Sequence, residues 1–193
     1  MSDYCLKCAK KREDCCRTDY AKFTTLEDAE RIASFLNAPI NEVAVYSSLS
    51  DNDVKTELFK NKTHGYYYDF ADKDKKVLQL KKKEDGSCVF LDDNGACKIY
   101  PVRPLICRVY PFWYSNDEVI EDSNGISGCP ILGGSKSNGA TANLPRENVE
   151  QSVRKIGTNI SSLKLLFTQL KGELENYTVN IKSFIKKNGI KGY

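Results

Sequence analysis

Residues 97–112, CKIYPVRPLICRVYPF, place two cysteines among two arginines and three prolines. Prolines restrict the backbone, and arginines are permanently charged donors that pair with anions. A chain that holds thiols rigidly beside guanidinium groups can use them as a redox pair, as a disulfide or as metal ligands. The pattern of the other six cysteines bears on which of these three uses applies.

The eight cysteines of this 193-residue chain form two groups. The first opens with a Cys-x-x-Cys spacing, which lets two sulfurs turn toward one ion, and continues with a double cysteine. The second is spread over residues 88–129. Thiolates gathered at one place repel each other unless a cation or a cluster neutralises them. The candidate metal ligands are therefore Cys5, Cys8, Cys15, Cys16, Cys88, Cys97, Cys107 and Cys129.

The number of thiols does not identify the metal, because zinc and iron–sulfur clusters both accept four thiolates. The wide gaps around Cys97, and a Cys129-Pro130 ending like that of ferredoxin runs, favour an iron–sulfur cluster of the [4Fe–4S] type, with zinc as the alternative. Eight ligands can serve two four-thiolate sites, or one site with spare cysteines. We expect Lys10, Lys11, Arg12, Arg103 and Arg108 to offset the negative charge.

The composition is that of a globular protein, with 40% apolar and 28% charged residues. A net charge of +3 is too small to indicate nucleic-acid binding. The first residues contain no apolar signal-peptide core, and no stretch approaches the roughly 18 apolar residues that span a bilayer. We therefore expect a cytoplasmic protein that is not associated with a membrane, in a compartment where disulfides are rare.

Local patterns predict short helices and strands before residue 130. TTLEDAERIASFL (24–36) is typical of a helix that Thr25 caps with Asp28 at the box position, and APINEVAVYSSLS (38–50) indicates a second, short helix. KDKKVLQLKKK (73–83) suits a solvent-exposed edge strand protected by lysines. The Asn94-Gly95 turn predicts a hairpin with Cys88 and Cys97 on neighbouring strands, and PLICRVY (104–110) a short helix carrying Cys107.

A heptad pattern occupies residues 146–187. Gly157 and Gly172 are weak points at which this helical region can break or bend. The pattern fits a long amphipathic helix or a helical hairpin packed on its own domain, or alternatively a homodimer formed through residues 149–184. The apolar positions are 149, 153, 156, 160, 163, 167, 170, 174, 177, 181 and 184.

Three segments, CLKCAKKREDCC, LEDAERIASF and CVFLDDNGACKIYPVRPLICRVYPF, resemble the YkgJ-type cysteine-cluster family, also described as a zinc- or iron-chelating domain. Relatives include the flagellin lysine-N-methylase. The resemblance implies a metal or iron–sulfur site built from these cysteines. Six residues stand here between Cys8 and Cys15, where the family has two, so the first pair and the double cysteine can belong to one site or to two.

The sequence thus predicts an α+β fold: a cysteine-cluster domain over 1–130, a Gly/Ser/Asn-rich linker over 131–145 and an amphipathic helical region over 146–193. The leading hypothesis is a metal-binding protein with a structural or redox site. The alternatives are an iron–sulfur oxidoreductase or a methylase-like protein-modifying enzyme, and an assembly module whose terminal helix recruits a partner. The sequence names neither a protein partner nor an electron partner.

Overall fold

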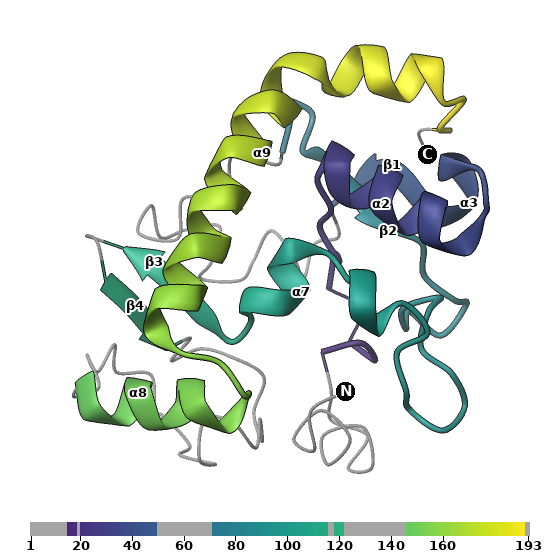
Figure 1. Cartoon of the computed structure of the whole chain (residues 1–193). Helices are drawn as coiled ribbons and strands as arrows, with labels where there is room; N and C mark the ends of the chain where they lie inside the picture. The colour runs from purple at the N-terminus through teal and green to yellow at the C-terminus, as the bar shows by residue number, and fades with distance from the viewer. Residues whose placement is uncertain (1–14, 19, 50–70, 116–117, 122–145, 192–193) are drawn as a thin grey trace.

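The fold is α+β, as predicted, with short antiparallel strands and a long C-terminal helix (Figure 1). The computed structural model describes residues 15–18, 20–49, 71–115, 118–121 and 146–191. Its elements in chain order are α2 (Leu26–Leu36), α3 (Ile40–Val43), β1 (Ala44–Ser48), β2 (Lys76–Leu80), the 3-10 helix η2 (Tyr100–Val102), α7 (Leu105–Val109), β3 (Phe112–Ser115), β4 (Glu118–Glu121), α8 (Arg146–Lys155) and α9 (Ile160–Lys187).

Helix α2 begins where the capping signal predicts. The Thr25 hydroxyl accepts a hydrogen bond from the Asp28 amide at 3.0 Å, and the Asp28 carboxylate accepts one from the Thr25 amide at 3.5 Å. This reciprocal pair satisfies two amides that have no partner inside the helix. The predicted inner face is also confirmed: Leu26, Ala29, Ile32 and Ala33 are buried, and Leu36 packs against them.

The segment predicted as a second helix divides into two elements. Helix α3 covers only residues 40–43, and the chain then extends into β1, which pairs antiparallel with β2. The prediction of a helix over the whole segment is wrong. Tyr46 lies opposite Leu78 in this pairing, and such cross-strand contacts decide the conformation of a short apolar run that helix and strand patterns share.

Strand β2 is buried, so the prediction of a solvent-exposed edge strand is also wrong. One edge of β2 pairs with β1. On its other edge, the Thr24 amide donates to the Leu78 carbonyl at 3.1 Å and the Leu80 amide donates to the Lys22 carbonyl at 2.9 Å. Val77, Leu78 and Leu80 are in the core. The lysines flank this strand, whereas the strand itself is largely apolar.

A second hairpin, β3–β4, is separate from the first sheet. Phe112 and Trp113 of β3 are almost completely buried. The ring of Tyr114 stacks on Phe167 of α9 with centroids 5.6 Å apart. Helices α8 and α9 both contact β4, so this hairpin rests against the C-terminal helices (Figure 1).

The C-terminal helical pattern breaks at Gly157, one of its two predicted weak points. Gly157 has φ of +75°, a conformation that favours glycine, and it lies between α8 and α9. Asn159 then caps α9 by accepting a hydrogen bond from the Ser162 amide at 2.8 Å. The helical region is therefore a pair of helices, and α9 bends in its C-terminal half (Figure 1).

The heptad face is packed inside the chain. Helix α9 contacts α2, α7 and β4. The apolar positions from 163 onward are buried, and those at 156 and 160 are partly buried. A homodimer through residues 149–184 would have to displace this packing.

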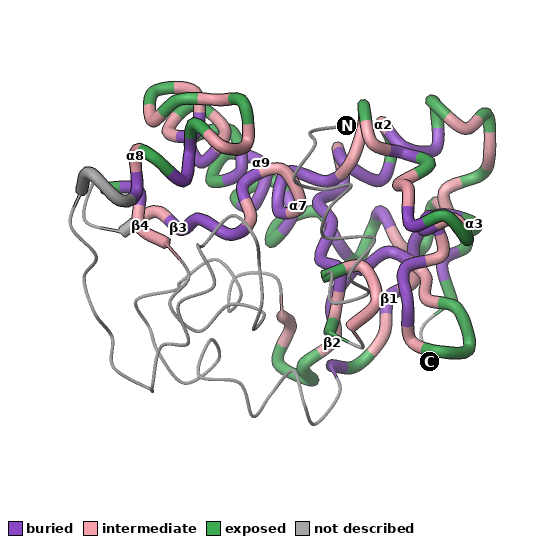
Figure 2. The backbone as a smooth tube through the Cα atoms, turned by 90° about the horizontal axis from the view of Figure 1, so that it is seen from below, coloured by how far each residue is buried: buried purple, intermediate pink, exposed green. Residues whose placement is uncertain are grey.

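One hydrophobic core contains buried residues of α2, β2, α7 and α9 (Figure 2). The predicted linker, 131–145, lies outside the described residues. No helix in the described part of the chain is both long and apolar enough to cross a bilayer.

Candidate metal centre

Two tight reversals of the chain carry Cys88 and Cys97. The Gly95 amide donates to the Asp92 carbonyl at 3.0 Å, and Gly95 has φ of +80°, so the predicted Asn94-Gly95 turn is confirmed. The predicted hairpin strands are not formed. Single bridges, Lys82 to Cys88 and Leu91 to Cys97, replace them. The reason is that the chain turns again directly after each cysteine: the Leu91 amide donates to the Cys88 carbonyl at 3.0 Å, and the Tyr100 amide donates to the Cys97 carbonyl at 3.1 Å.

The double cysteine, Cys15-Cys16, contacts the chain at Cys88, just after the reversal at residues 83–87. The Cys88 amide donates to the Cys16 carbonyl at 2.7 Å, so residues far apart in the sequence become neighbours. Cys16 is partly buried, whereas Cys15 is exposed. No disulfide joins any two of the cysteines that the structure describes. Cys5, Cys8 and Cys129 lie outside the described residues.

Helix α7 brings Cys107 to the same place. Burial raises the pKa of the Cys107 thiol well above its usual value, and the charges of Cys16, Cys88 and Cys97 raise that pKa further. Burial likewise raises the pKa of Cys88 to about 11, with smaller contributions from Cys16 and Cys97. The structure therefore gathers four of the predicted ligands, from three separate segments, within electrostatic range of one another.

Two cationic side chains, those of Arg103 and Lys22, lie near these thiols. The positive charge of Arg103 lowers the pKa of Cys107, as the sequence leads us to expect, and its guanidinium also lies 4.2 Å from the centre of the Tyr100 ring. Arg108 instead lies among Arg31, Arg103, Asp28 and Glu173. Its predicted role of offsetting thiolate charge stays a prediction, and another residue also supplies positive charge near the thiols.

That residue is Lys22, which the sequence reasoning missed. Its side chain is only 7% exposed, and its ammonium donates to the carbonyls of Thr18 and Tyr20. Burial lowers the pKa of Lys22, and the charges of Cys88, Cys16 and Cys15 oppose that change. No local signal marks this lysine among the 29 basic residues of the chain, because its importance comes from contacts between distant segments.

The donor set suits zinc or an iron–sulfur cluster in kind, since both take thiolates. Within the described ranges, however, no three cysteine, histidine, aspartate or glutamate side chains already converge on a point where one ion could bind. The four thiols are near neighbours whose mutual repulsion a cation would relieve. A bound metal would be held by Cys16, Cys88, Cys97 and Cys107, or by some of these with the cysteines outside the described residues.

The chain is similar to known proteins. The chain is 32% identical over 110 residues to an uncharacterized protein of Methanocaldococcus jannaschii, in a match that covers 56% of this chain and 44% of that protein. The chain thus spans less than half the length of this curated relative. No solved structure matches the chain. Residues 4–130 match the CxxCxxCC family, described as "Putative zinc- or iron-chelating domain". The chain belongs to this family of zinc- or iron-chelating domains.

Proposed function

We propose that the protein coordinates an iron–sulfur cluster of the [4Fe–4S] type, with Cys16, Cys88, Cys97 and Cys107 among its ligands. One observation carries the proposal: four thiols from segments as far apart as residues 16 and 107 come within electrostatic range of one another. Four is the number of thiolates that such a cluster takes. The remaining cysteines, Cys5, Cys8, Cys15 and Cys129, serve the same site or a second one.

The charge balance of the site supports metal binding over a cluster of bare thiols. Burial and the charges of neighbouring thiolates raise the pKa of Cys88 and Cys107, so without a cation these two thiols stay protonated at neutral pH. Lys22 and Arg103 contribute positive charge, but a metal or cluster contributes more, and it does so at the sulfurs themselves. The family description, which covers zinc and iron, agrees with this reading.

Anaerobic purification of the untagged protein tests the proposal. Iron, zinc and acid-labile sulfide are measured per chain, together with the visible spectrum. We expect brown protein with matching amounts of iron and sulfide. Colourless protein with stoichiometric zinc would overturn the iron–sulfur assignment and keep metal binding. Anaerobic material with neither metal, which also fails to take up iron with sulfide or zinc, would overturn both.

Single Cys→Ser variants then assign the ligands. We expect the Cys16, Cys88, Cys97 and Cys107 variants each to reduce the metal content. Cys15→Ser is measured beside Cys16→Ser, because Cys15 adjoins Cys16 in sequence but is exposed; an unchanged metal content in Cys15→Ser would exclude Cys15 from the ligands. A full metal content in all four variants of the gathered cysteines would place the site elsewhere in the chain.

A further inference from the structure

Helix α7, which carries Cys107, lacks a cap of its own. It has five residues, and its N-cap is Pro104, whose side chain offers no hydrogen-bond acceptor. The first amides of any helix find no carbonyl inside the helix and need an acceptor from elsewhere. For a helix this short, that acceptor fixes a large part of the position of the helix.

Asp28 supplies the acceptor from α2. Its two carboxylate oxygens lie 3.0 Å and 3.2 Å from the amide nitrogen of Leu105, the first residue of α7. Asp28 is 1% exposed and Leu105 is completely buried, so water has little access to take over this hydrogen bond. Cys107 follows two residues later on the same helix.

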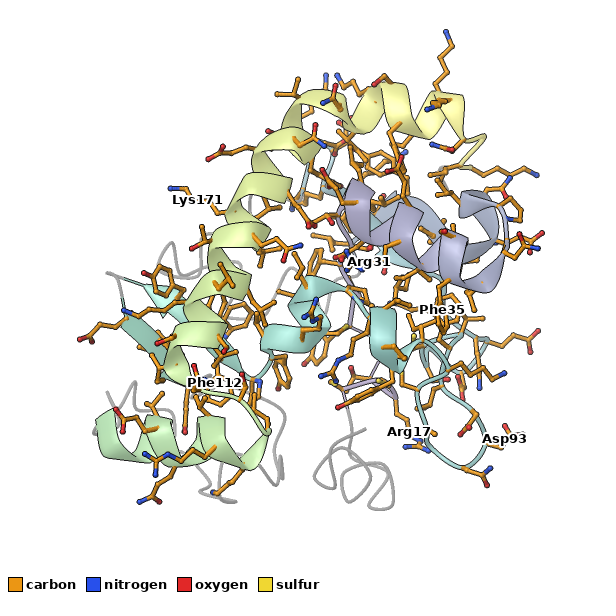
Figure 3. The ribbon with its side chains drawn as sticks, in the orientation of Figure 1. Arg17, Arg31, Phe35, Asp93, Phe112 and Lys171 are labelled. Atoms are coloured by element: carbon orange, nitrogen blue, oxygen red, sulfur yellow. The ribbon has the colours of Figure 1, made fainter. Side chains whose placement is uncertain are left out.

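The carboxylate is itself held from several sides. Asp28 takes part in the capping box with Thr25, and its carboxylate forms an ion pair with Arg31, which lies on the side of α2 that faces α7 (Figure 3). The Thr25 hydroxyl also donates to Glu173 of α9 at 2.5 Å. Contacts outside α7 therefore also fix the position of Asp28: it contacts Thr25 and Arg31 directly, and Thr25 in turn contacts Glu173.

We infer that Asp28 is a positioning residue for the metal centre. Its carboxylate caps α7 and thereby places the thiol of Cys107 among the thiols of Cys16, Cys88 and Cys97. The inference rests on the proposed function only for its consequence, metal binding. The capping itself can be tested in metal-free protein.

The first test measures the alkylation rates of Cys107 and Cys88 by iodoacetamide in the metal-free full chain, read by peptide mass spectrometry. Asp28→Ala removes the acceptor, so we expect Cys107 to react about tenfold faster relative to Cys88. Asp28→Asn keeps an oxygen acceptor and should restore the wild-type ratio. The matched control is Asp72→Ala, which truncates a carboxylate that is hydrogen-bonded to Tyr46, outside this network, and should leave that ratio unchanged. If Asp28→Ala does not fold, Asp28→Leu removes the acceptor and leaves no cavity, because its side chain branches at the same carbon and is larger.

An unchanged ratio in the Asp28→Ala variant would overturn the inference. Equal acceleration of Cys88 and Cys107 would also overturn it, because it would indicate general loosening of the core.

The second test is a double-mutant cycle on zinc affinity. We expect Asp28→Ala to weaken binding roughly 10- to 100-fold, the range for residues that orient metal ligands. If Asp28 acts through Cys107, the double variant Asp28→Ala/Cys107→Ser binds no more weakly than Cys107→Ser alone. Independent, multiplying effects would contradict that route. Absence of metal binding by the wild-type protein would refute the proposed function, while the alkylation ratios would still decide the role of Asp28.

Discussion

The cysteine-bearing loops and the C-terminal helix are stabilised in different ways. Residues 81–99 are held by successive turns and by single bridges, and their backbone hydrogen bonds are mostly local. Helix α9 instead buries a continuous apolar face against α2, α7 and β4. We expect the helical core to form without a metal, whereas the loops bring together buried and partly buried thiols that repel one another when ionised. A metal should therefore stabilise the loops far more than the core.

Metal removal should give the largest effect, and it tests the difference between the loops and helix α9 most directly. Structural zinc contributes about 10–16 kcal/mol to the folding of small metal-dependent peptides, so a large local change is expected. Hydrogen exchange should show at least about tenfold faster exchange at residues 82–98, with α9 unchanged. Equal loss of protection in both regions would mean that loops and helix fold as one unit.

Truncation of a buried side chain of α9 should instead lower the stability of the helical core. Leu170 is completely buried on α9, so Leu170→Ala should lower the free energy of unfolding by about 2–5 kcal/mol. Leu165 lies on the same helix but is 70% exposed, and Leu165→Ala should change it by about 0.5 kcal/mol or less. Denaturant unfolding measures both. Sedimentation adds a check on assembly: if Leu170 instead held a dimer together, Leu170→Ala would produce a folded monomer from a dimeric wild type.

The pH dependence of stability should reveal Asp28, which joins α2 to α7. Burial raises its pKa to about 6 from an ordinary 3.8, despite the opposing charge of Arg31. Because the folded-state pKa is the higher one, the contribution of Asp28 to stability is fully present below about pH 4 and is lost as the pH rises through 6. A shift of this size corresponds to about 3 kcal/mol.

Asp28→Asn provides the measurement, because asparagine does not titrate. The stability of this variant relative to wild type, from guanidinium unfolding, should increase between pH 4 and pH 7. A difference that is constant with pH would show that Asp28 has an ordinary pKa.

Lys22 should give the smallest effect, confined to the loops. Lys22→Met keeps the apolar stem and removes the charge near Cys88 and Cys16, so the pKa of Cys88 should rise and metal affinity should fall about tenfold. The matched control is Lys98→Met, which removes an exposed charge from the same loop region. Equal effects of the two substitutions on metal affinity would show that the buried position of Lys22 gives its charge no special role at the metal centre.

The sequence by itself determined what local chemistry specifies. Thr25 and Asp28 cap a helix because their side chains reach amides three residues away, and the turn at Asn94-Gly95 forms because glycine tolerates positive φ. The heptad pattern likewise predicted a long helical region, and Gly157 marked its break. The cysteine spacing identified the kind of ligand, because that depends on residue type.

Tertiary structure alone decided which distant residues meet. Residues 44–48 became a strand because β2 pairs with them, and β2 is buried because residues 22–24 cover its other edge. The gathering of Cys16, Cys88, Cys97 and Cys107, and the nearness of Lys22, arise from chain reversals and helix packing. Asp28 caps α2 through a local signal and α7 through a contact 77 residues away. Local patterns could not reveal the second contact, because a hydrogen bond between distant segments depends on the packing that brings them together.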